Sequence, residues 1–136
     1  MRRRFLSYAA VLSCVLASVG ATRADDAPVA SGLSSDGKVR ADMLSLKRTE
    51  GDTVTLRFAI VNDSNRTVST TLGNMRLIDL VGRTSYEPGV TSSSCSADAG
   101  AKTICWAVFA APGPNTKSIN VKFYDAFDLI STPITN

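Results

Sequence analysis

The sequence contains no histidine. Histidine is the commonest general base and a frequent metal ligand, so its absence excludes Ser-His and Cys-His nucleophile pairs and any zinc or copper site with imidazole ligands. Enzymes that work with carboxylates alone are not excluded. The composition therefore favours a protein that is not an enzyme and that needs no metal or cofactor.

Cysteines are few as well: the chain has three, and Cys14 lies far from the other two. Cys95 and Cys105 have neither the C-x-x-C spacing of a redox pair nor two further soft ligands with which to hold a metal ion. We therefore predict a disulfide bond between Cys95 and Cys105, with two free thiols as the alternative. In the chain-entropy model, closing a loop of about 11 residues stabilises a protein by about 2.8 kcal/mol.

Long hydrophobic runs are absent except at the N-terminus, which reads MRRRFLSYAAVLSCVLASVGATRA over residues 1–24. Three arginines precede an apolar stretch over residues 5–21, and small residues offer cleavage sites after Ala21 and Ala24. This pattern predicts a cleaved signal peptide over residues 1–24 and an extracytoplasmic chain, periplasmic or secreted, without a transmembrane span. The arginine cluster leaves general secretory and twin-arginine export both open. VLSC, which ends at Cys14, resembles a lipobox, so a lipoprotein is the alternative.

The chain that would follow the signal peptide carries no excess of positive charge. Four of the 15 Lys and Arg residues lie in the first 24 positions, and the other 11 face 12 Asp and Glu residues. A nearly neutral domain lacks the broad positive field that nonspecific binding to nucleic acid requires. The sequence therefore predicts no nucleic-acid partner.

Apolar and polar residues alternate with a period of two along most of the chain after residue 37, and no long segment has helical spacing. The clearest strand is TVTLRFAIVN, residues 53–62, and turn-forming residues separate it from its neighbours. Residues 25–37 are polar and small, which predicts a flexible N-terminal tether. Residues 38–136 are predicted to form one all-β domain, an antiparallel β-sandwich of seven or eight short strands.

Four local features follow from the same pattern. A change of apolar face within KVRADMLSLK predicts a β-bulge near Met43. Gly73 and Asn74 are predicted to form a tight hairpin between two short strands, with a positive φ at Gly73. The segment around Cys95 is expected to be a loose surface loop. Pro133 places the last strand at the edge of a sheet, because proline cannot donate to a strand ladder.

Four single residues invite a functional interpretation. We expect Asp79 to accept hydrogen bonds from the turn closed by Gly82, with a catalytic carboxylate as the alternative. Trp106 is predicted to be a core tryptophan packed against the disulfide, with a ligand-stacking aromatic as the alternative. Asp125 and Asp128 are interpreted as solvated loop charges rather than as ligands of a hard cation, because they lack the spacing of a calcium loop.

The stretches VTLRFAIVNDSN, MRLIDLVGRTSYEPG and WAVFAAPGPNTKSINVKF resemble the DUF4352 or MPT63-like domains over roughly residues 38–134. That resemblance implies an immunoglobulin-like β-sandwich in a secreted or surface-anchored bacterial protein, with roles that are mostly unknown or protein-binding and with no catalytic residues. The chain departs from many such domains in having the Cys95 and Cys105 pair. The matching residues are Asn62, Leu77, Asp79, Gly82, Tyr86, Pro88, Phe109 and Pro112.

We expect an exported, non-enzymatic domain that binds another protein or a component of the cell envelope. The candidate contact patch is Asn120, Lys122 and Tyr124, which alternate with apolar residues and should face outward. The alternative is an accessory or structural subunit of an envelope or secretion assembly, which would pair through the edge strand that contains Pro133. The oligomeric state is left open.

Overall fold

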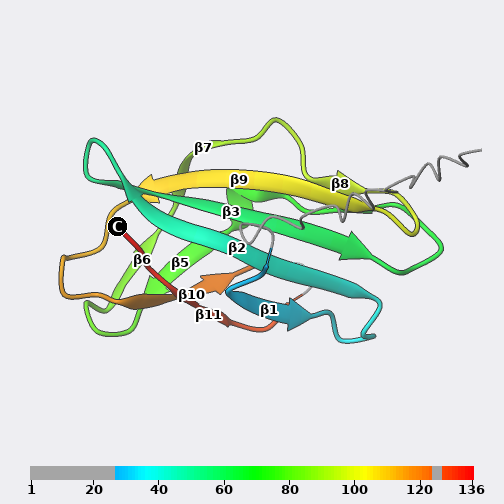
Figure 1. Ribbon diagram of the computed structural model, residues 1–136, viewed down its shortest axis with the longest axis horizontal. Coiled ribbons are helices and arrows are strands. Elements are labelled where there is room, and N and C mark those ends of the chain that lie inside the picture. The colour runs from blue at the N-terminus through cyan, green and yellow to red at the C-terminus, as the bar shows by residue number, and fades with distance from the viewer. Residues whose placement is uncertain (1–26, 124–126) are drawn as a thin grey trace, which may run out of the picture.

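The computed structural model describes residues 27–123 and 127–136, and it confirms an all-β antiparallel sandwich (Figure 1). Two sheets enclose one hydrophobic core, and a two-stranded sheet closes one end. The described part of the chain has no helix beyond a 3₁₀ turn, η2 (Leu72–Asn74). The predicted signal peptide, Tyr124 and Asp125 lie outside the described residues.

The first sheet has the spatial order β1 (Ala30–Leu33), β2 (Val39–Thr49), β3 (Thr53–Asn62), β9 (Lys102–Ala110) and β7 (Pro88–Thr91). The second sheet has the order β11 (Ile130–Pro133), β10 (Ser118–Lys122), β5 (Arg76–Asp79) and β6 (Thr84–Tyr86). The third consists of β4 (Val68–Ser69) and β8 (Ser96–Ala97). The described residues therefore form eleven strands rather than the predicted seven or eight, because strands of two to four residues are too short to show an alternation.

β2 and β3 form the long hairpin at the centre of the first sheet. The predicted bulge is confirmed, since the pairing shifts by one residue between Met43 and Ser45. The turn between the strands places Gly51 at φ 76° and Asp52 at φ 55°, a left-handed conformation that glycine adopts without steric cost. The bulge keeps apolar residues facing the core on both sides of it, so one long strand serves the whole length of the sheet.

The core lies between the inner faces of the two main sheets. Alternate residues of β3 are fully buried, as the sequence pattern predicts; those of β9 lie beside them in the same sheet, and those of β10 lie in the opposite sheet. The ring of Phe123, which follows β10, contacts the rings of Phe58 and Phe127 edge-on. The distances between ring centroids are 5.3 Å to Phe58 and 5.4 Å to Phe127. This row of three rings runs from the middle of the core to one end of the sandwich. The largest fully buried side chains include Phe58, Phe109, Met43, Leu46, Leu56, Ile60, Met75 and Leu77.

Three local predictions were wrong. Residues 30–33, inside the predicted tether over 25–37, form β1, which pairs with β2 and is too short to show a pattern. Gly73 and Asn74 lie in the 3₁₀ turn and Gly73 has no positive φ, because β4 pairs with β8 and not with β5. The segment around Cys95 is not loose throughout, since β8 lies within it.

Candidate functional site

The predicted disulfide between Cys95 and Cys105 is present, with 5.8 Å between the two Cα atoms. Cys105 is a core residue of β9, and Cys95 is buried just before β8. The bond closes a loop that contains β8, whose residues Ser96 and Ala97 pair with β4, and the first residues of β9. The amide of Thr70 also donates to the carbonyl of Cys95 at 2.8 Å. The disulfide thus fixes the end of the sandwich where the two-stranded sheet lies.

Asn62, the last residue of β3, is a fully buried polar side chain that ties together the same end of the sandwich. Its Nδ2 group donates to the carbonyl oxygens of Arg66 at 2.7 Å, Ala97 at 2.9 Å and Asp98 at 3.1 Å. Its Oδ1 atom accepts from the amide and the hydroxyl of Ser64 at 3.0 and 2.6 Å. Sequence reasoning singled out Asn62 as part of a family pattern but did not assign it this role.

The buried carboxylates have structural partners. Asp79 accepts hydrogen bonds from the amides of Val81 at 2.9 Å and Gly82 at 3.0 Å, as predicted, and from the hydroxyl of Thr116 at 3.0 Å. The Gly82 amide is the main cause of a lowered Asp79 pKa. Burial opposes ionisation of Asp42, but hydrogen bonds from Arg40 and Ser31 outweigh it and lower its pKa as well.

Trp106 does not lie in the core, so that prediction was wrong. β9 points Cys105, Ala107 and Phe109 inward, and therefore Trp106 points to the outer face of the sheet. The position of Cys105 could have predicted, from the sequence alone, which residues of β9 face the core. If a disulfide-bonded Cys105 faces the core, strand alternation puts its two neighbours outside.

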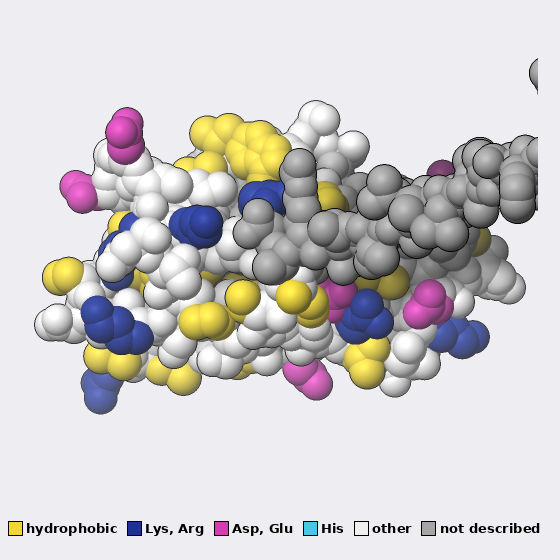
Figure 2. Space-filling view, in the orientation of Figure 1, with side chains coloured by type: hydrophobic (Ala, Val, Ile, Leu, Met, Phe, Trp, Pro, Cys, Tyr) yellow, Lys and Arg dark blue, Asp and Glu magenta, His cyan; other side chains and the backbone are white. Residues whose placement is uncertain are grey.

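An exposed apolar surface runs along the outer face of β9 and β7, and we call it the Trp106 face. Trp106 is 39% exposed, Ile104 is 48% exposed on the same strand, and Val90 is 61% exposed on β7. Val108 lies between them, because it pairs with Val90 in the β7–β9 ladder. Figure 2 shows hydrophobic side chains gathered near β7 and β9 in this view. Exposed apolar residues on two neighbouring strands form a patch rather than isolated contacts.

Basic side chains accompany this patch. Arg57 of β3 is exposed and pairs directly with Trp106 across the ladder, and Lys102 begins β9 two residues before Ile104. Asp42 is the only acidic residue in the five strands of this sheet, and Arg40 neutralises it at 2.7 Å. The basic residues of the same strands are Arg40, Lys47, Arg48, Arg57 and Lys102.

The contact patch predicted from the sequence lies on the other sheet. Asn120 and Lys122 point away from the core and are half-buried, because β10 is flanked by β11 and β5. Asn120 borders a hollow of about 310 Å³ beside Leu80 and Ser131. Tyr124 lies outside the described residues, so the patch of three stays a prediction.

Within residues 27–123 and 127–136, no cluster of three or more Asp, Glu or Cys side chains could hold a metal ion. Asp128 is exposed in the segment before β11. The same part of the chain contains no helix with the length and hydrophobicity that a membrane span requires. No family model, no curated protein and no solved structure matches the chain.

Proposed function

We propose that this chain is an exported, non-enzymatic interaction domain that binds an acidic surface of another protein through its Trp106 face. The observation that carries the proposal is Trp106 itself, exposed on the outer face of the sheet beside Ile104 and Val90. Tryptophan is enriched among the residues that dominate protein interfaces, because it buries a large area at a small cost in side-chain entropy.

The charges on this sheet indicate the chemistry of the partner. Arg57 pairs with Trp106 across the ladder, Lys102 lies near the end of the same face, and the one acidic residue is neutralised by Arg40. Aromatic and arginine side chains together are typical of interface centres. A partner surface with carboxylates around an apolar centre would match both parts of the face and would be steered toward it.

Two observations support export. The Cys95–Cys105 disulfide is typical of proteins in oxidising compartments, and residues 1–24 have the pattern of a signal peptide. The resemblance to secreted DUF4352 or MPT63-like domains agrees with both. The non-enzymatic part is supported by the roles of Asp42 and Asp79, whose oxygens are engaged by neighbouring side chains and a turn.

A second candidate is the subunit role, in which β11 pairs with a strand of another protein. β11 lies at the edge of the second sheet, which supports this candidate. Directly after it, however, Thr135 accepts from the amide of Arg48 at 2.8 Å and donates to the carbonyl of Leu46 at 2.9 Å. The chain therefore crosses to β2 at this corner, which shortens the edge available to a partner.

Site-specific photo-crosslinking in the producing cell tests the proposal. A photoreactive phenylalanine analogue is placed at position 106 and, in separate variants, at position 81 of the exposed β5–β6 turn and position 131 of β11. We expect a defined adduct with another protein from position 106 only. The combined charge reversal Arg57→Glu and Lys102→Glu should abolish that adduct.

Position 81 is a matched control, because Val81 is also an exposed apolar residue but lies on the other sheet. An adduct from position 131 alone would support the subunit role instead. An adduct from position 81 alone, or no adduct at position 106, would contradict the proposal. An adduct that survives the charge reversal would contradict the acidic nature of the partner.

A further inference from the structure

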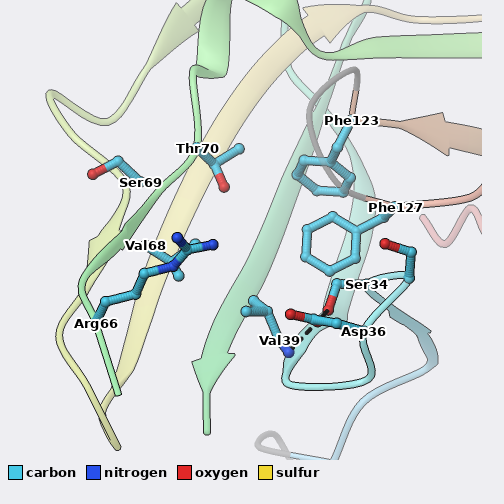
Figure 3. A pocket seen from close by; sticks show the side chains of 10 residues that line it. Ser34, Asp36, Val39, Arg66, Val68, Ser69, Thr70, Phe123 and Phe127 are labelled. Atoms are coloured by element: carbon cyan, nitrogen blue, oxygen red, sulfur yellow. Dashed lines mark hydrogen bonds between the residues drawn. The ribbon is translucent and has the colours of Figure 1, made fainter. Parts of the chain in front are cut away.

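A cavity of about 260 Å³ opens at the end of the sandwich that the disulfide and Asn62 hold together. It lies between two walls from distant parts of the sequence: the β1–β2 loop on one side and residues 66–70 on the other (Figure 3). Pockets for drug-sized ligands usually measure about 300–1,000 Å³, so this one suits a smaller molecule.

The floor of the cavity is aromatic. Phe127 and Phe123 line it, and their rings contact each other edge-on at 5.4 Å. Val39 and Val68 add aliphatic surface from the two walls. Since Phe123 also contacts Phe58, the floor is continuous with the hydrophobic core. It is suited to the apolar side chain of a ligand.

Two opposite charges face the opening. Arg66 extends from one wall into the space, and Asp36 comes from the facing loop (Figure 3). The Arg66 guanidinium has no hydrogen bond or ion pair with any residue that the structure describes. Asp36 Oδ1 accepts from the Ser34 hydroxyl at 2.6 Å and the Lys38 amide at 3.0 Å, while no bond to Oδ2 is formed within the described residues. The Ser34 hydrogen bond is the main cause of a lowered Asp36 pKa, so the carboxylate is charged at neutral pH.

Hydrogen bonds within the chain hold both walls in place. Asn62 binds the carbonyl of Arg66, and the Thr70 amide binds the carbonyl of Cys95. On the other side, the Ser34 hydroxyl accepts from the Val39 amide at 3.0 Å. Walls ordered before a ligand arrives lower the entropy cost of binding.

From this arrangement we propose that the cavity binds a free α-amino acid with an apolar side chain. The guanidinium of Arg66 receives the carboxylate, the carboxylate of Asp36 receives the ammonium group, and the side chain lies on Phe127 and Phe123. Arginine is suited to the first role, because its planar donor pair matches a carboxylate. A ligand with only an anionic group or only a cationic group would engage either Arg66 or Asp36, but not both.

Isothermal titration calorimetry on the purified chain tests this assignment with three matched probes. The probes are L-phenylalanine, 3-phenylpropionate, which lacks the ammonium group, and phenethylamine, which lacks the carboxylate. We expect L-phenylalanine to bind about tenfold or more tightly than either analogue, since each analogue loses one hydrogen-bonded charge contact. Arg66→Gln should remove the advantage over phenethylamine, and Asp36→Asn the advantage over 3-phenylpropionate.

Lys117→Gln and Glu50→Gln serve as controls, because both residues are exposed and neither lines the cavity. Their affinities should equal that of the unchanged chain. Absence of binding by L-phenylalanine at millimolar concentration would overturn the proposal, as would equal binding of all three probes. Tighter binding of L-phenylalanyl-L-phenylalanine would also overturn it, because that result would assign the cavity to a peptide. None of these results depends on the Trp106 face, so the two proposals fail separately.

Discussion

Asn62 holds three stretches of chain with one side chain. Its amide group donates to carbonyls of Arg66, Ala97 and Asp98, which belong to the β3–β4 loop, β8 and the segment after β8. A buried carbonyl that loses its donor costs about 1–3 kcal/mol, and the carbonyl of Ala97 is in this position. The side chain of Asn62 therefore makes hydrogen bonds to backbone carbonyls that a longer strand would otherwise make.

We expect Asn62→Ala to lower the free energy of unfolding by about 2–4 kcal/mol, because the buried carbonyl of Ala97 and two partly buried carbonyls lose their donor at once. Asn62→Asp should be at least as harmful, since it keeps the acceptor but turns a carboxylate oxygen toward carbonyls. Urea unfolding at neutral pH measures both. Asn65→Ala is the control, because Asn65 is exposed in the same loop. A loss at Asn62 no larger than at Asn65 would contradict this account.

We expect the turn that Asp79 stabilises to be sensitive to acid. Its pKa is lowered in the folded protein, mainly by the Gly82 amide. A lowered folded-state pKa means that the stabilising effect is present above the unfolded value of about 4 and is lost as the pH falls through the folded value. Asp79→Asn should therefore be less stable than the unchanged chain at neutral pH, and the difference should shrink below about pH 4. Urea unfolding across the acid range measures it; a difference that stays constant with pH would contradict the prediction.

Among the elements, the β5–β6 turn depends on a close approach of backbone and carboxylate. A Cβ atom on Gly82 would lie 2.8 Å from Asp79 Oδ2, whereas one on Gly73 would meet nothing within 4 Å. The Asp79 carboxylate cannot move aside without losing its hydrogen bonds to Val81, Gly82 and Thr116. The turn therefore has no space for a side chain at position 82.

Gly82→Ala should lower stability by about 1–3 kcal/mol through this overlap, as overpacking does elsewhere. Gly73→Ala should stay within about 0.5 kcal/mol, since its surroundings are open. The midpoints of urea denaturation compare the two substitutions directly. Equal midpoints would contradict this account, because they would show that the Asp79 carboxylate can move aside at little cost in stability.

The long strands could be predicted from the sequence and the short ones could not. β3 and β10 show enough alternation to identify their buried faces, and the shift of face at Met43 correctly located the bulge. β9 was identified but assigned the wrong face, because Ile104 and Trp106 are more hydrophobic than the Cys105 and Ala107 that the core contains. Hydrophobicity alone therefore assigned the wrong residues of β9 to the core.

The short elements and the cavity depend on contacts between distant residues. β1 and the β4–β8 pair exist because a neighbouring strand supplies the hydrogen bonds, so four residues or fewer carry no signal of their own. Arg66 and Asp36 lie 30 positions apart in the sequence, and nothing in either surrounding stretch indicates that they face one cavity. The disulfide was predictable because the count of cysteines restricts the alternatives.

For the whole molecule, the disulfide is the main constraint on the end that carries the cavity. Replacing both cysteines, Cys95→Ala with Cys105→Ala, should lower the free energy of unfolding by about 2.8 kcal/mol from loop entropy, with a further loss from the methyl-sized voids. It should also weaken binding of L-phenylalanine, since the wall that contains Arg66 loses support. Urea unfolding and calorimetry measure the two effects.

Ser94→Ala is the matched control, because Ser94 is exposed beside Cys95 and takes no part in the bond. Thiol labelling of the denatured, unreduced protein gives an independent check. Cys95 and Cys105 should react only after a reductant is added. Reaction of both cysteines before reduction would contradict the disulfide. Unchanged stability of the double variant would contradict the stabilisation that we assign to the bond.

The position of β9 governs when this protein can fold. β9 lies between β3 and β7, although residues 63–101 separate β3 from it in the sequence. A growing polypeptide that ends before residue 102 lacks the strand that joins the two parts of the sheet, so β3 still has an unpaired edge. Such an edge attracts other strands, so the incomplete sheet is prone to mispairing and aggregation until β9 has been made. Late synthesis of one central strand thereby delays closure of the whole sheet until most of the chain has been made.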